Sequence, residues 1–295
     1  MLSILITIYN YNLLPLVVEI HRQCSELDIF FEILTQDDAS NSMHNIKNKE
    51  INLLSYCNYV SLEKNIGYRQ NKNILVSNSK YENLLIIDGD CILPNTDFIK
   101  NYIDQIINYD VVYGGRIHAE SAPSKNQLLR WKYGKFMEDQ TVQQREKNPY
   151  GSTLFNNTLI KKAVFNAIKF DDSFKKYGND DTLFSFELKK LNVKINHINN
   201  PVQHDDIDTN LVYVEKTKHS LENLKLLHQK KLIPTDYSKM LRLTSKLHRY
   251  KVTYLLSSFY DVFKLIMEYN LISNNPSLFV FNTFRLSYFC KLYIK

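Results

Sequence analysis

Two carboxylates separated by one glycine, Asp88 and Asp90, stand directly after an apolar run at residues 84–87. Four apolar residues without alternation are typical of a strand buried on both faces of a mostly parallel sheet. Gly89 lets the backbone turn sharply, so both carboxylates can converge at the carboxyl end of the strand, where open α/β sheets bind ligands. Hard oxygen ligands at such a point fit Mg²⁺ or Mn²⁺ carrying a diphosphate. Taken alone, the same residues also fit an ordinary Asp-Gly turn.

A second acidic pair, Asp180 and Asp181, follows a glycine turn at Gly178 and opens a predicted helix that runs to about Leu191. The helix dipole favours carboxylates in a first turn, which explains the pair without chemistry. A carboxylate placed there can also accept a proton in catalysis. His204 follows a predicted strand at 193–198; a lone histidine is most often a surface residue, but it can also be a third metal ligand.

The first part of the chain alternates predicted strands with predicted helices, which indicates a parallel sheet with right-handed crossovers. The expected strands are 2–9, 30–35, 59–62 and 84–87, with helices at 13–27 and 72–79. Polar residues close three of these strands: Asn10, Asp37 with Asp38, and Asp88 with Asp90. Because the carboxyl ends of parallel strands share one edge, we expect a single site there.

The segment after Pro94 is expected to form a helix at 97–108 and a short strand at 110–113. Residues 121–150 are polar, basic and aromatic, which predicts a long surface loop of the kind that often carries function. A strand at 152–156 and a helix at 159–168 are expected to follow.

Composition sets limits on the class of protein. A length of 295 residues, 44% hydrophobic and 23% charged, indicates a soluble globular chain of one large or two smaller domains. The net charge of +6 fits an anionic substrate, a nucleic acid or an acidic membrane surface. The four cysteines lack CxxC spacing, which favours a reducing, cytoplasmic compartment over a zinc site or disulfide framework. Neither a signal peptide nor a membrane span is expected.

Glycine placement argues against several nucleotide-binding classes. A dinucleotide-binding fold would carry GxGxxG directly after the first strand, where residues 7–12 contain no glycine. A P-loop is absent as well, and so is the glycine-rich phosphate loop of a sugar-nucleotidyltransferase.

Taken together, these pieces resemble the GT-A-fold nucleotide-sugar glycosyltransferases, in particular the inverting family 2 type found in bacterial surface-polysaccharide biosynthesis. The resemblance covers about residues 2–205. The matching pieces are Thr7-Ile8-Tyr9-Asn10, Asp37-Asp38-Ala39-Ser40, Asn65-Ile66-Gly67, Asp88-Gly89-Asp90, Gly178-Asn179-Asp180-Asp181 and Pro201-Val202-Gln203-His204. It implies a Rossmann-like α/β fold, with a mostly parallel central sheet flanked by helices.

The resemblance also implies roles for single residues. Thr7 and Asp38 would bind the nucleotide base, Asp88 would approach the ribose and the metal, and Asp90 would ligate the metal. Asp181 matches the usual catalytic base, with Asp180 beside it. His204 matches a histidine that completes the metal site in many members. The remaining residues of the implied nucleotide-sugar site are Tyr9, Asn10, Asn65, Lys72 and Gly89.

Two positions depart from the family pattern. Ala39 stands where the family usually has glycine, and Lys72-Asn73 stands where an Arg-Asn pair is usual. Neither touches the metal chemistry; both bear on the fit to the base and the diphosphate.

The implied activity is inverting transfer of a sugar from a nucleotide-sugar, UDP-linked by resemblance, to a hydroxyl of a glycan or lipid-linked glycan. Mn²⁺ or Mg²⁺ would offset the charge of the leaving diphosphate, and Asp181 would act as base. Three alternatives are a metal-dependent nucleotidyl- or phosphotransferase, a non-catalytic glycan-binding or assembly protein with a degenerate site, and a nucleic-acid binder. The first is disfavoured because the chain has no glycine-rich loop. The second is disfavoured because Asp90, Asp181 and His204 occur together, and the third because no nucleic-acid motif is present.

The expected domains are a catalytic domain at 1–205, with a nucleotide-sugar half (1–115) and an acceptor half (116–205), and a helical C-terminal extension at 206–295. Residues 206–231 predict a polar helix, whose apolar positions are Leu211, Val214, Leu221, Leu224 and Leu227.

Residues 242–295 are basic and aromatic, with only Asp261 and Glu268 as acids. Further apolar residues share one helical face there: Leu255, Phe259, Val262, Phe263 and Ile266. This face would pack on the catalytic domain, pack on a second subunit in a homodimer, or anchor the chain at the inner face of the cytoplasmic membrane.

Overall fold

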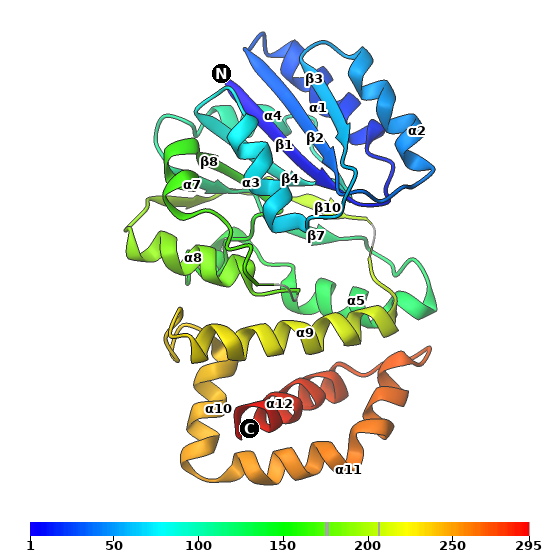
Figure 1. The fold of residues 1–295 in the computed structure, drawn as a ribbon, viewed down its shortest axis with the longest axis vertical. Coiled ribbons are helices and arrows are strands. Elements are labelled where there is room, and N and C mark those ends of the chain that lie inside the picture. The colour runs from blue at the N-terminus through cyan, green and yellow to red at the C-terminus, as the bar shows by residue number, and fades with distance from the viewer. Residues whose placement is uncertain (175–176, 206, 295) are drawn as a thin grey trace. The chain divides into compact units, whose positions relative to one another are not determined.

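The computed structural model describes residues 1–174, 177–205 and 207–294. Lys175 and Lys176, which precede the second acidic pair, lie outside the described residues, as do Asp206 and Lys295 of the predicted extension. The chain forms two compact units (Figure 1). The first comprises Met1–Ile117, Asp139–Ser173 and Glu187–Asp206; the second comprises His118–Glu138, Phe174–Phe186 and Ile207–Lys295. The second unit thus includes two segments, His118–Glu138 and Phe174–Phe186, that lie within the expected catalytic domain at 1–205.

The first unit is built on a seven-stranded mixed sheet, with the order β3-β2-β1-β4-β8-β6-β9. Its strands are β1 (Leu2–Ile8), β2 (Phe31–Asp37), β3 (Cys57–Ser61), β4 (Asn83–Asp88), β6 (Val111–Tyr113), β8 (Asn157–Lys161) and β9 (Ile195–His197). The strands β1 to β4 are parallel, whereas β8 is antiparallel to both β4 and β6. The predicted α/β class is therefore confirmed, with one antiparallel strand inside the sheet.

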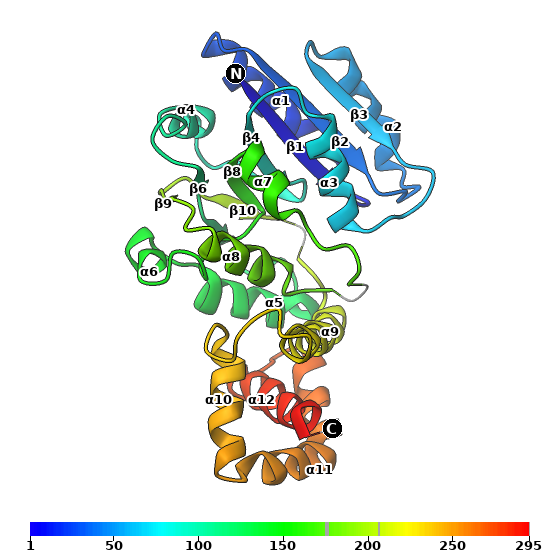
Figure 2. The ribbon, with the colours of Figure 1, turned by 60° about the vertical axis from the view of Figure 1, so that its left-hand side comes forward.

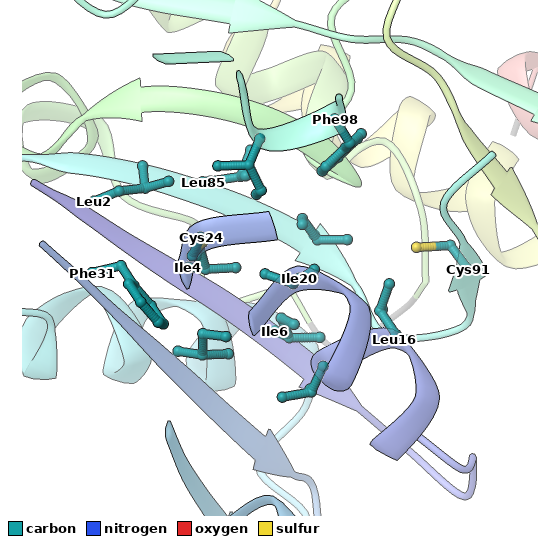
Figure 3. Packing of buried hydrophobic residues seen from close by; sticks show 14 of the residues in the cluster. Leu2, Ile4, Ile6, Leu16, Ile20, Cys24, Phe31, Leu85, Cys91 and Phe98 are labelled. Carbon is teal, nitrogen blue, oxygen red and sulfur yellow. The ribbon is translucent and has the colours of Figure 1, made fainter. Parts of the chain in front are cut away.

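Short helices accompany the sheet. They are α1 (Leu14–Glu26), α2 (His44–Asn48), the 3₁₀ helix Lys49–Leu53, α3 (Tyr68–Asn78), α4 (Phe98–Ile103), α6 (Val142–Glu146) and α7 (Lys162–Ile168). Leu16, Ile20 and Cys24 of α1 pack against Ile4 and Ile6 of β1 (Figure 3). The helical spacing of apolar residues predicted this helix, and the burial of its apolar face against β1 fixes the strand and its polar carboxyl end in the fold.

Two sequence-based predictions for the middle region were wrong. The strand expected at 152–156 is β8, at Asn157–Lys161, and the helix expected from 159 begins at Lys162. Hydrogen bonding to β4 and β6 on both sides fixes this strand, although it starts with the buried polar residues Asn157 and Thr158.

The segment 121–150 is also not a loop throughout. It contains the 3₁₀ helix Lys125–Gln127, α5 (Leu128–Tyr133), the π-helical turn Gly134–Glu138, and α6. Arg130 and Arg145 are buried. Arg130 forms an ion pair with Glu138 at 2.9 Å, and Arg145 donates to the carbonyl oxygen of Ile198 at 2.7 Å. These contacts give the basic residues of this segment structural partners.

A second, three-stranded sheet has the order β5-β10-β7 and consists of β5 (Cys91–Ile92), β10 (Val202–His204) and β7 (Arg116–His118). The antiparallel pairing of β10 with β5 places His204 opposite Cys91. Because β5 directly follows Asp90, this pairing places β10 beside the Asp88-Gly89-Asp90 turn.

The second unit is helical, as expected for the C-terminal extension (Figure 2). It contains the start of α8 (Asp180–Lys190), followed by α9 (Asn210–Gln229), α10 (Lys239–Arg249), α11 (Val252–Ile272) and α12 (Leu278–Ile294). Its cores join α9, α11 and α12 through side chains such as Val214, Tyr260 and Phe284. Of the five apolar positions predicted in α9, all but Leu211 are buried. Within the described residues no helix has the length and apolar character that crossing a membrane requires.

Candidate active site

The first carboxylate at the end of β4, Asp88, forms an ion pair with a lysine of α3. The buried Lys72 ammonium donates to Oδ1 of Asp88 at 2.8 Å and to the carbonyl oxygen of Phe155 at 2.9 Å. Asp88 itself is half-buried, with its backbone N–H donating to the carbonyl oxygen of Asn156. Lys72 therefore fixes the orientation of Asp88, and the structure places these two predicted residues in contact.

Gly89 is required where the backbone crosses β1. Its N–H donates to the carbonyl oxygen of Thr7 at 3.1 Å. A Cβ at position 89 would lie 2.6 Å from Cδ1 of Ile8 and 3.0 Å from the Thr7 carbonyl oxygen. Any side chain would push the turn away from β1, and it would move the two flanking carboxylates.

Asp90 and His204 meet although they are distant in sequence. Nε2 of His204 lies 3.2 Å from Oδ2 of Asp90, and the Asp205 N–H donates to the carbonyl oxygen of Asp90 at 3.0 Å. Burial raises the pKa of the Asp90 carboxyl, but the hydrogen bond and charge of His204, with Lys72 nearby, outweigh burial and hold that pKa below its ordinary value. Asp90 is thus an anion at neutral pH.

Both predicted metal-site carboxylates and His204 line one pocket in the first unit. Its other lining residues, which the sequence did not single out, are Cys91, Arg116, Asn156 and Val202. Arg116 directly follows the Gly114-Gly115 turn, and a cation at such a turn is a sequence signal for an anion-binding residue. A guanidinium beside carboxylates and an imidazole makes the pocket suited to a phosphate group and a cation together.

The side chains at this pocket offer few ligands for a divalent metal. Among the described residues, no group of three or more His, Cys, Asp or Glu side chains is arranged to hold a metal ion. Mg²⁺ and similar hard ions, however, are commonly held by one or two carboxylates together with substrate phosphates, rather than by an all-protein cage. The Asp90 carboxylate with the His204 imidazole fits such a site; Asp88 is engaged by Lys72.

Asp38 is tied to the turn that follows β3. Its two carboxylate oxygens accept from the N–H groups of Ile66 (2.8 Å) and Gly67 (2.9 Å), and Nδ2 of Asn65 donates to its carbonyl oxygen. Asp38 is buried, and Gly67 has φ of +84°. The structure therefore brings the predicted residues Asp38 and Asn65 together, with Asp38 acting on the turn that contains Asn65.

The end of β1 and the loop that follows it carry the remaining predicted residues. Thr7 is paired with Asp88 in the sheet register, Tyr9 is exposed, and Asn10 has a left-handed backbone with φ of 54°. The hydroxyl of Tyr11, which the sequence did not single out, donates to Asp205. This bond links the loop after β1 to the segment that follows His204.

The second acidic pair opens α8, as the sequence predicted. The first turn of α8 belongs to the second unit. The turn before it is fastened to α9: Nδ2 of Asn179 donates to the carbonyl oxygen of Ser220 at 2.6 Å, and Nδ2 of Asn223 donates to that of Gly178. Gly178 has φ of +94°, a conformation that favours glycine. Burial, and then the charge of Asp181, raise the pKa of Asp180 to about 8.

The sequence matches a known family over more than half of its length. Residues 3–169 match the family described as Glycosyl transferase family 2. No curated protein matches the chain.

Solved structures share the fold. The chain is similar over 100% of its length to the mannosyltransferase PcManGT from Pyrobaculum calidifontis in complex with GDP-Man and Mn²⁺, at 11% identity, 87% coverage of that chain and a TM-score of 0.58. It is similar over 99% of its length to S. aureus TarS 1-349 in complex with UDP-GlcNAc, at 15% identity, 91% coverage and a TM-score of 0.54. In two other TarS comparisons the chain spans 63% and 39% of the solved chain. The likeness to the first two structures, both with a TM-score above 0.5, confirms the GT-A fold.

Proposed function

Because the chain belongs to glycosyl transferase family 2, we propose that it moves a sugar from a nucleotide-sugar to an acceptor hydroxyl, with inversion at the anomeric carbon. The observation that carries the proposal is the Asp90–His204 contact in the pocket that Asp88 and Arg116 also line. This pocket offers an anionic carboxylate, an imidazole and a guanidinium at the sheet edge where a diphosphate would leave.

The donor side of the reaction rests on residues of the first unit. Asp90 and His204 would hold Mn²⁺ or Mg²⁺, which supplies positive charge opposite the departing diphosphate. Lys72 keeps the Asp88 carboxylate oriented toward the same edge. Asp38 holds the turn at residues 65–67, which supports a nucleotide site beside β2.

The acceptor side requires a base. The acceptor oxygen forms a bond to the anomeric carbon as the bond from that carbon to the diphosphate oxygen breaks, and the acceptor proton passes to a carboxylate. We assign this role to Asp181. Its neighbour Asp180, with a pKa raised to about 8, keeps its proton near neutral pH, so the negative charge of the pair lies on Asp181. One direct displacement inverts the anomeric configuration.

A donor panel tests the activity itself. The purified chain is incubated with Mn²⁺ and each of several UDP-, GDP- and TDP-sugars, and released nucleoside diphosphate is measured with and without glycan acceptors. We expect release from one nucleotide class, UDP by resemblance, and a raised melting temperature with that donor and Mn²⁺. Release of pyrophosphate or of a nucleoside monophosphate would indicate a nucleotidyl- or phosphotransferase instead.

His204→Ala should weaken metal binding without abolishing transfer. Removing the imidazole leaves Asp90 as the remaining protein ligand, so the Mn²⁺ concentration for half-maximal activity should rise about 10-fold or more. The measurement is a Mn²⁺ titration at saturating donor. His219→Ala, at a histidine of α9 that is not part of this pocket, is the matched control. An unchanged titration in His204→Ala would remove His204 from the metal site.

The acceptor we propose is a hydroxyl of a glycan or of a lipid-linked glycan used in surface-polysaccharide synthesis on the cytoplasmic side. A lipid-linked acceptor would place the enzyme at a membrane surface. A homodimer is the other arrangement that an apolar helical face would serve.

A further inference from the structure

Helix α11 presents an apolar face to solvent. Five large hydrophobic side chains, at positions that helical periodicity places on one side of the helix, are each between 67% and 77% exposed: Leu255, Val262, Leu265, Ile266 and Tyr269. Phe259 and Phe263 are also exposed, and their rings contact each other at a centroid distance of 4.6 Å. A surface helix normally turns polar residues outward, so this face marks an interaction site.

The opposite side of α11 is the one that packs. Its buried residues are Thr253, Ser257, Tyr260, Met267 and Leu271. The small side chains Thr253 and Ser257 leave room for neighbouring helices, and α12 lies directly alongside (Figures 1 and 2). The unit's own core is therefore complete without the apolar face.

The two acidic residues of α11 form ion pairs with neighbouring helices. Asp261 pairs with Lys291 of α12, and Glu268 pairs with Lys218 of α9 at 2.7 Å. These are the only acidic residues between positions 239 and 294. Neither lies free to repel an anionic surface.

Exposed cations lead directly into the apolar face. Lys239, Arg242, Lys246 and Arg249 of α10, together with Lys251 at the start of α11, are all exposed. The tyrosines beside them at the corner between the helices, Tyr250 and Tyr254, are exposed as well. Cations beside aromatic and aliphatic side chains are the composition of a helix that lies at the surface of an anionic bilayer.

We propose that α10 and α11 dock this protein on an anionic lipid bilayer, with α11 lying in the plane of the interface. Its apolar side chains would enter the boundary of headgroups and acyl chains, and the cations of α10 would meet the lipid headgroups. A second copy of the chain is a poorer partner, because its α10 would bring a second set of cations with no acidic counterpart on these helices.

Vesicle binding tests the docking site on the full chain. Sedimentation is measured with phosphatidylcholine vesicles with and without 30 mol% phosphatidylglycerol, at low and high salt. We expect binding only with phosphatidylglycerol, and weaker binding as salt rises. Ile266→Glu should weaken vesicle binding at least about 10-fold, because burying the new carboxylate opposes insertion. Arg242→Gln with Arg249→Gln should weaken it roughly fivefold per cation.

Matched control variants show whether the α10 and α11 substitutions act on docking itself or only through unfolding or a change in net charge. Ile107→Glu replaces an isoleucine of the first unit that is even more exposed than Ile266, and Lys47→Gln with Lys49→Gln removes two exposed cations there; both should bind like the parent chain. Light scattering of Ile266→Glu without lipid reports on self-association. Absence of vesicle binding by the parent chain, or a parent dimer that Ile266→Glu dissociates with unchanged vesicle binding, would overturn the proposal. Neither result depends on the proposed sugar transfer.

Discussion

Replacing Asp90 by alanine should abolish sugar transfer while the fold survives. The Asp90 side chain meets His204 in the pocket rather than packing in the core, so its removal costs little packing. The loss removes the anionic ligand that would hold the metal against the departing diphosphate. Removing one such electrostatic group costs about 10²–10³ in rate, and loss of the metal costs more. Turnover should therefore fall at least about 10²-fold.

Three measurements accompany Asp90→Ala. Circular dichroism and the melting temperature report whether the fold survives, and a melting-temperature shift with donor and Mn²⁺ reports metal-dependent binding. That shift should disappear in Asp90→Ala and persist in Asp104→Ala, which removes an exposed aspartate after α4. An Asp90→Ala protein with near-normal turnover would end the assignment of the metal to this pocket.

The polar ends of β1, β2 and β4 were predictable because long strands carry strong patterns. Residues 84–87 form an unbroken apolar run, and β4 ends at Asp88, as the sequence indicated. The partnership of Asp90 with His204 was implied only by resemblance. It depends on pairing between β5 and β10, which are two and three residues long, too short to leave a periodic signal.

Strand β8 shows a second limit of sequence patterns. Its first residues, Asn157 and Thr158, are polar, yet they are fully buried between β4 and β6. Nδ2 of Asn157 donates to the carbonyl oxygens of Gly115 and Asn200, so its burial is satisfied by hydrogen bonds. An alternation rule places such residues in a loop, whereas tertiary hydrogen bonding places them in the sheet.

Helix α11 shows that periodicity predicts which residues share an apolar face, but not whether that face points to the core or to solvent. Leu255, Val262 and Ile266 share one side of the helix, as expected. A predicted apolar face is usually assigned to the core. Here the side with Thr253 and Ser257 packs instead, because small residues allow close helix contact, and the apolar side remains exposed.

Asp181→Asn should retain donor binding and lose turnover. An amide keeps nearly the same shape as a carboxylate but cannot accept the proton of the acceptor hydroxyl. A general base contributes on the order of 10²–10⁴ in rate, so kcat should fall by that factor. Donor affinity, measured by the melting-temperature shift with nucleotide-sugar and Mn²⁺, should stay close to that of the parent chain.

Asp180→Asn is the decisive control, because the two residues are adjacent and share the first turn of α8. Burial and the charge of Asp181 raise the pKa of Asp180 to about 8, so near pH 7 most Asp180 side chains are protonated. A neutral amide resembles that protonated carboxyl, and Asp180→Asn should therefore keep most of its turnover at pH 7. Above pH 8 the parent chain gains a second negative charge in the pair, and the variant does not. The pH–rate profiles should consequently diverge only on the alkaline side. If Asp180→Asn were the crippling change and Asp181→Asn the mild one, the base would be Asp180.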